Sequence, residues 1–179
     1  MTKIRRLSYT AICIALGIVL PMLFHAIPNG GQVFLPMHIP VLLCGLAVGP
    51  LYGLAAGLLT PALSCVLTGM PLAAMLPGMM LELAMYGLIG GWAMARLPIA
   101  NPLGRTVAAL LAAMLAGRLA GGLLNALVLK AGSYSLQAFV TGYFLTGLPG
   151  IAIQAVLIPT VMTAMQKAGI IKDAGGTAD

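Results

Sequence analysis

Long apolar segments, separated by short clusters of glycine, proline and charged residues, make up almost the whole chain. A helix needs about 20 mostly apolar residues to cross a bilayer, and most of these segments are close to that length. Pro28, Asn29 and the two glycines that follow end the first segment, because proline and glycine favour turns. The pattern predicts membrane-spanning helices at residues 7–26, 37–49, 51–68, 71–97, 105–130 and 139–167.

The second and third predicted helices come from one apolar stretch, residues 37–68, that is interrupted once. A straight helix over 37–68 would be about 47 Å long, which is too much for a single span. Gly49 and Pro50 interrupt this stretch, so we expect two shorter helices there. The first of them, 37–49, is short for a span, and we expect it to be tilted or partly shielded by its neighbours.

Basic residues support this division and give an orientation. Lys3, Arg5 and Arg6 precede the first span, and Arg96 and Arg105 flank the loop between the fourth and fifth spans. Such residues are concentrated on the cytoplasmic side of membrane proteins, so an even number of crossings must separate the two groups. Four crossings satisfy this. With two further spans after Arg105, both termini are expected in the cytoplasm. We expect one membrane domain, 1–172, and a disordered tail, 173–179.

Composition excludes several classes of protein. The chain is 61% hydrophobic and 7% charged, with a mean hydropathy of +1.07, so it has no room for a sizeable soluble domain. Any nucleotide hydrolysis must therefore come from a partner. The net charge of +6 reflects basic residues beside apolar segments, which membrane topology explains better than nucleic-acid binding. Three cysteines inside apolar segments are interpreted as small packing residues.

Glu82 and Arg118 are the charged side chains inside the apolar segments. A charge at bilayer depth is costly and usually faces a bundle interior or a cavity. Measured from the nearest cytoplasmic basic residue at 1.5 Å per residue, both side chains and Gln154 lie about 20 Å deep. Tyr86, one turn from Glu82, and Asn125, two turns beyond Arg118, extend the same helix faces.

The two charges have two explanations. Arg118 is suited to a carboxylate or phosphate, and Glu82 accepts from ammonium, hydroxyl or amide groups, so together they fit a polar, even zwitterionic, small molecule. Alternatively, they neutralise each other and only fix helix packing. Gln32 and His38, near the first loop, are candidates for lining an outward-facing mouth of a binding site.

The sequence contains no Walker A loop, no GxSxG or HExxH motif and no pair of intramembrane aspartates. We therefore expect no catalytic residues, no cofactor and no metal. Glu82 is the lone intramembrane carboxylate and the two halves show no inverted repeat, which disfavours a self-sufficient carrier. Two alternatives stay open: a membrane-embedded enzyme that uses Glu82 as acid or base, and a scaffold subunit that only packs against partners.

Pairs of small residues four positions apart allow helices to approach closely in lipid. Ala11 and Ala15 form such a pair on the first span, which carries the basic N-terminus and is expected at the periphery. The remaining pairs are expected to serve contacts within the bundle: Gly53 and Gly57, Gly87 and Gly91, and Gly117 and Gly121.

Four features resemble the substrate-binding S components of energy-coupling factor (ECF) vitamin transporters. They are the size with six spans and cytoplasmic termini, the stretch TAICIALG at 10–17, the segment 35–50 running into 51–57, and the glycine- and proline-rich fourth span. The similarity covers nearly the whole chain. It implies an all-α, six-helix S-component fold in a bacterial or archaeal cytoplasmic membrane, and a transport subunit rather than an enzyme.

The resemblance also implies partners and roles. An S component captures a water-soluble vitamin or precursor from outside and topples in the bilayer to release it inward. It does so on a membrane coupling subunit (T component) driven by two cytosolic ATPases. An Ala-x-x-x-Ala face on the first helix meets the coupling subunit, and here it corresponds to Ala11 and Ala15.

The family's pocket lies toward the outer side, between the later helices and the first, third and fifth connections. The candidate substrate-binding residues are Glu82, Tyr86, Arg118, Asn125, Gln154, His38 and Gln32. Pantothenate, a folate-like molecule, a pyridoxine-like molecule and a cobamide base precursor all remain possible substrates.

Overall fold

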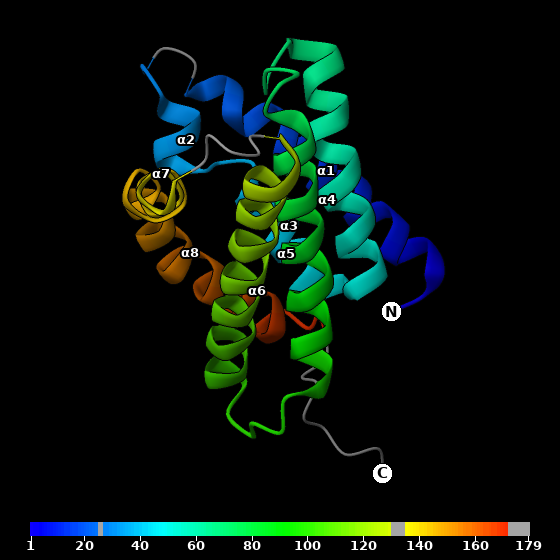
Figure 1. Cartoon of the computed structure of the whole chain (residues 1–179). Helices are drawn as coiled ribbons and strands as arrows, with labels where there is room; N and C mark the ends of the chain where they lie inside the picture. The colour runs from blue at the N-terminus through cyan, green and yellow to red at the C-terminus, as the bar shows by residue number, and fades with distance from the viewer. Residues whose placement is uncertain (25–26, 130–134, 172–179) are drawn as a thin grey trace.

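The computed structural model describes residues 1–24, 27–129 and 135–171, and these ranges contain helices and no strands. Figure 1 shows the helices as one bundle. The elements are α1 (Lys3–Leu23), α2 (Gly30–Phe34), α3 (His38–Val48), α4 (Pro50–Thr68), α5 (Leu76–Arg96), α6 (Pro102–Leu124), the π-helix η1 (Asn125–Leu129), α7 (Leu136–Val140), the π-helix η2 (Thr141–Leu145) and α8 (Leu148–Lys167).

Six helical stretches are long and apolar enough to cross a membrane, which confirms the predicted all-α, six-span architecture. They are Lys3–Leu23, Gly30–Val48, Pro50–Thr68, Leu76–Arg96, Pro102–Leu129 and Leu148–Lys167. The predicted division at Gly49 and Pro50 is also confirmed. Gly49 has a φ of 128°, which favours glycine, and Pro50 begins α4, where its missing N–H removes no helical hydrogen bond.

The predicted start of the last span was wrong. The apolar run that begins at 139 holds two elements: α7 with η2, and α8 from Leu148 onward. Pro149 explains the break, because it has no N–H for the hydrogen bond to the Leu145 carbonyl that a continuous helix would need, and Gly147 provides the turn. In Figure 1 α7 is viewed nearly end-on beside the upper end of α8. Residues 136–145 are therefore a separate short apolar helix.

Glycines allow α5 to lie in direct backbone contact with α4 and α3. A Cβ added at Gly87 would overlap the backbone of Gly53, and one at Gly57 would overlap the backbone of Leu83. A Cβ at Gly91 would lie 2.5 Å from the backbone nitrogen of Pro50, far inside van der Waals contact. The prediction that these small-residue pairs serve contacts within the bundle is confirmed.

The first span lies at the edge of the bundle, against α3 and α4 (Figure 1). Thr10 and Gly17 are its buried residues, whereas Ala11 and Ala15 are exposed. Cys44 donates a hydrogen bond from Sγ to Thr10 Oγ1 at 3.7 Å, and the three cysteines are free, consistent with a packing role.

The loop between α5 and α6 lies at the lower end of the bundle in Figure 1, and the C-terminal ends of α4 and α6 lie at the upper end. In this loop the Arg105 side chain donates from Nε to the carbonyl of Ile99 at 2.9 Å. The tail predicted to be disordered, 173–179, lies outside the described residues.

Candidate functional site

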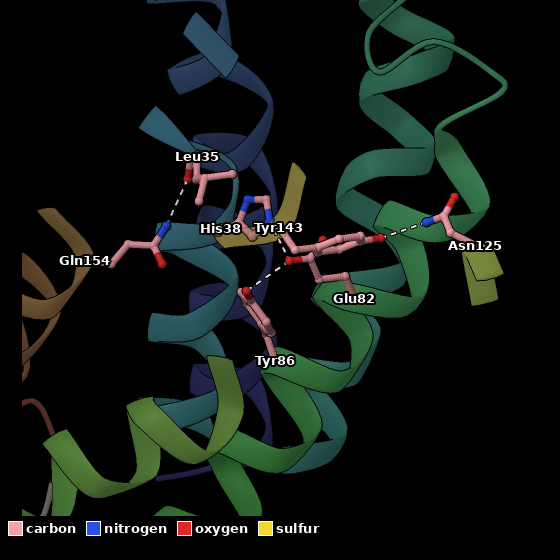
Figure 2. A network of polar contacts seen from close by, with 7 residues as sticks. All are labelled: Leu35, His38, Glu82, Tyr86, Asn125, Tyr143 and Gln154. Atoms are coloured by element: carbon pink, nitrogen blue, oxygen red, sulfur yellow. Dashed lines mark hydrogen bonds and ion pairs between the residues drawn. The ribbon is translucent and has the colours of Figure 1, made fainter. Parts of the chain in front are cut away.

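Glu82 lies at the centre of a buried polar cluster formed by α3 and α5. Its Oε1 accepts a hydrogen bond from the Tyr86 hydroxyl at 3.0 Å and lies 3.7 Å from His38 Nε2. Tyr86 is one helical turn from Glu82, so the two side chains share a face of α5, and His38 begins α3 directly opposite. Figure 2 shows the three side chains pointing toward one another. All three are at least nine-tenths buried.

A glycine on α6 makes room for this arrangement. A side chain at Gly117 would overlap the Tyr86 ring, so its absence lets the ring pack against α6. The next residue, Arg118, is 3% exposed and therefore lies inside the bundle at the same contact between α5 and α6. Close approach of the helices thus brings the predicted charges of both spans into one region.

The guanidinium of Arg118 forms few polar contacts with the described part of the protein. Its guanidinium carbon lies 5.5 Å from the centre of the Phe144 ring, a cation–π contact with η2. Its Nε and Nη2 are buried and have no hydrogen-bond partner among the described residues. Within the same residues no ion pair joins Arg118 to Glu82, whose closest basic neighbour is His38.

Asn125 lies one turn above the cluster, at the start of η1. Its Nδ2 donates to the Gly121 carbonyl at 3.0 Å and to the Tyr143 hydroxyl at 2.8 Å. A Cβ placed on Gly121 would lie 2.9 Å from that hydroxyl and 3.3 Å from Glu82 Cβ, so Tyr143 reaches toward the space between α5 and α6. Figure 2 shows Tyr143 between Glu82 and Asn125.

Sequence reasoning missed Tyr143 and Phe144. The apolar pattern places both residues in the sixth predicted span, 139–167. Aromatic side chains in a transmembrane helix are common and do not by themselves indicate a functional site. Gly147 and Pro149 were the available signal, because they separate this aromatic segment from α8.

Gln154 enters the region from α8 and is fully buried. Its Nε2 donates to the carbonyl of Leu35 at 3.3 Å, while its Oε1 is buried without a partner among the described residues. Leu35 has a φ of 51°, a left-handed conformation that is uncommon for a leucine, and it ends α2 just before His38. Leu35 thus links Gln154 to the Glu82 cluster (Figure 2).

Gln32 is not brought to the cluster. It lies on exposed α2, and its Nε2 is 4.0 Å from Met75 Sδ in the segment before α5. Ala11 lies on the other side of the bundle, in an apolar groove of about 440 Å³ between α1 and α4, and neighbouring groove residues include Leu7, Ile14 and Tyr52.

In the part of the chain that the structure describes, no three His, Cys, Asp or Glu side chains gather in a way that suits a metal ion. The polar region instead offers one carboxylate, one guanidinium, two hydroxyls, one imidazole and two amides. This set suits recognition of a small polar molecule by hydrogen bonds.

A family model described as "ECF transporter, substrate-specific component" matches residues 5–168, nearly the whole chain. The chain belongs to this family. No match was found among curated proteins or among solved structures. S components are substrate-binding transport subunits rather than enzymes, and they act with a membrane T component and ATPases. This S component is a multi-pass membrane protein with six apolar helices.

Proposed function

We propose that this S component captures a small water-soluble vitamin or vitamin precursor at the polar cluster and delivers it to the cytoplasm with its T component and two ATPases. The observation that carries the proposal is the buried guanidinium of Arg118, whose Nε and Nη2 have no partner among the described residues. A buried charge without hydrogen bonds is strongly unfavourable, so a polar ligand that satisfies it would bind with a large gain.

The ligand enters from outside. Arg96 and Arg105 mark the predicted cytoplasmic end of the bundle, which places both termini on that side. Glu82 lies less than two turns from the opposite end of α5, and Gln154 lies equally close to the same end of α8. The short helix 136–145 covers this end through Phe144, which contacts Arg118, and its movement would admit the ligand.

Delivery uses the opposite side of the molecule. Ala11 and Ala15 are exposed on peripheral α1, where small side chains allow another helix to approach closely. We assign this face to the T component. In Figure 1 α1 and α4 lie on one side of α5, and α6 and α8 lie on the other. A change on the α1 face would therefore disturb transport without touching the ligand. The protein would act in a bacterial or archaeal cytoplasmic membrane.

A thermal-shift screen of the purified protein in detergent micelles tests the proposal. A ligand at one hundred times its dissociation constant should stabilise the protein by about 2.7 kcal/mol. We expect at least one water-soluble vitamin or precursor to do so. The stabilisation should disappear in Arg118→Gln and persist in Arg96→Gln, which removes an exposed arginine at the far end of α5. A screen in which every compound leaves the melting temperature unchanged contradicts the proposal.

A further inference from the structure

The two unpartnered nitrogens of Arg118 belong to one edge of its guanidinium. Nε and Nη2 point their N–H bonds in the same direction, and both are buried without a partner among the described residues. Such a side-on pair matches the two oxygens of a carboxylate, which accept two parallel hydrogen bonds. The structure thus leaves the edge of the guanidinium that recognises a carboxylate unoccupied by any described protein group.

Among the described residues, no carboxylate forms an ion pair with this edge. The chain contains three acidic residues: Glu82, Asp173 and Asp179. Glu82 already accepts from Tyr86 and lies beside His38. Asp173 and Asp179 lie outside the described residues. No group of the described part of the chain therefore fills this edge of the guanidinium.

Gln154 adds a second requirement. Its Nε2 must face Leu35, because a carbonyl oxygen accepts and never donates, so Oε1 is the free end of the amide. A ligand hydroxyl or amide N–H would satisfy this oxygen. Gly147 lies between the two sites: a Cβ built there would be 3.6 Å from Arg118 Nη2 and 3.0 Å from Leu35 Cδ1.

From these contacts, and resting on the proposed function, we infer that the substrate carries a carboxylate. Its two oxygens bind Nε and Nη2 of Arg118, and a hydroxyl or amide N–H elsewhere in the substrate donates to Gln154 Oε1. The Phe144 ring lies against the Arg118 guanidinium and shields the resulting ion pair from water.

Matched pairs of compounds test this inference on the purified full-length protein. The pairs are pantothenate with panthenol and biotin with biotinamide; thiamine and riboflavin represent vitamins without a carboxylate. We expect one acid to bind and its neutral counterpart to bind at least about 100-fold more weakly, because the uncharged form leaves the guanidinium unpaired. The readouts are isothermal titration and thermal shift.

Three variants sharpen the test. Arg118→Lys keeps the charge but loses the side-on pair, and we expect about 10- to 100-fold weaker binding of the acid. Gly147→Ala, whose backbone φ of −87° suits alanine, places a methyl group beside the guanidinium and should weaken binding similarly. Arg96→Gln is the control and should bind as the parent does. The melting temperature without ligand shows whether each variant is folded.

The outcomes separate the two proposals. Binding of thiamine or riboflavin, retained in Arg118→Lys, overturns the carboxylate inference and leaves vitamin capture intact. Equal affinity for an acid and its amide or alcohol likewise overturns the carboxylate inference and leaves vitamin capture intact. An acid that binds equally well to the parent, Arg118→Lys and Gly147→Ala overturns the role of Arg118. Stabilisation by none of the compounds overturns both the inference and the proposed function.

Discussion

The two faces of α5 are built on different principles. Toward α3 and α4 the helix presents glycines, and the backbones touch with no side chain between them. Toward α6 and the first residue of α3, His38, it presents Glu82 and Tyr86, which share a hydrogen bond, while buried polar atoms of Arg118 and Gln154 stay unpartnered among the described residues. The glycine face holds the helices together, whereas the polar face has buried hydrogen-bonding atoms that a ligand could satisfy. Helix α5 thus has a packing face and a proposed ligand-binding face.

The difference follows from the bilayer. Lipid tails are as apolar as leucine, so helices in a membrane associate through close packing and polar contacts rather than through burial of apolar surface. Glycine contacts cannot adjust without separating the backbones, whereas side chains can change rotamers. We therefore expect the glycine face to be sensitive to any added atom and the polar face to be sensitive to chemistry.

The largest effect is expected at the glycine face. Gly87→Ala should destabilise the protein by more than about 3 kcal/mol, because its Cβ would overlap the backbone of Gly53 and push α4 away from α5. Unfolding in mixed micelles measures this. Gly31→Ala is the control, since no atom lies within 4 Å of its added Cβ, and it should stay within about 0.5 kcal/mol of the parent. Equal stability of the two variants would contradict the backbone contact.

A smaller effect is expected at the polar face. Glu82→Ala should cost about 1–3 kcal/mol, because the Tyr86 hydroxyl loses its acceptor and His38 loses the carboxylate beside it. Arg118→Ala should cost less than about 1 kcal/mol, since it removes a charge that has no partner among the described residues. The double variant should remain about as unstable as Glu82→Ala. Recovery of the stability that both single variants lose would mean that the charges pair with each other.

The link between η1 and η2 should contribute less. Tyr143→Phe removes the acceptor of the 2.8 Å hydrogen bond from Asn125 and should cost about 0.5–1.5 kcal/mol. If the segment 136–145 covers the ligand, the variant should also release ligand faster, which stopped-flow dissociation would detect. Tyr52→Phe, on the opposite side beside Arg6, is the control. An unchanged dissociation rate would remove this segment from the entry path.

The smallest effect on stability is expected on the exposed face of α1. Ala11→Trp and Ala15→Trp should change the free energy of unfolding by less than about 0.5 kcal/mol and leave ligand affinity unchanged. Uptake in proteoliposomes with the T component and ATPases should nevertheless be lost, because a bulky ring prevents close helix approach. Ile12→Trp, exposed on a different face of α1, should transport normally. Loss of ligand binding in the alanine variants would place this face inside the bundle.

The number and limits of the spans were largely predictable because apolar length is a local property. Gly49 and Pro50 marked the division between α3 and α4, and the structure has it there. The error at α7 has a local cause as well. The segment 139–144 is as apolar as a membrane-spanning helix, and only Gly147 and Pro149 separate the short helix 136–145 from α8.

Within the site, the sequence predicted depth but not partners. Helical rise alone placed Glu82, Arg118 and Gln154 at one level. The side chains that meet at that level depend on how each helix is rotated about its axis and on the distance between neighbouring helices. Neither quantity can be predicted from the sequence of one helix. His38 therefore emerged as the neighbour of Glu82, and Phe144 as the neighbour of Arg118, only in the folded chain.

By itself, the amino-acid sequence determined a six-span membrane protein of the S-component family with two charges inside its apolar segments, since length, hydropathy and the cost of charge in lipid act residue by residue. Only the tertiary structure decided that Glu82 is occupied by Tyr86 and His38 while one edge of Arg118 has no described partner. The physical reason is that hydrogen bonds form over about 3 Å, and glycine contacts between distant helices set that distance.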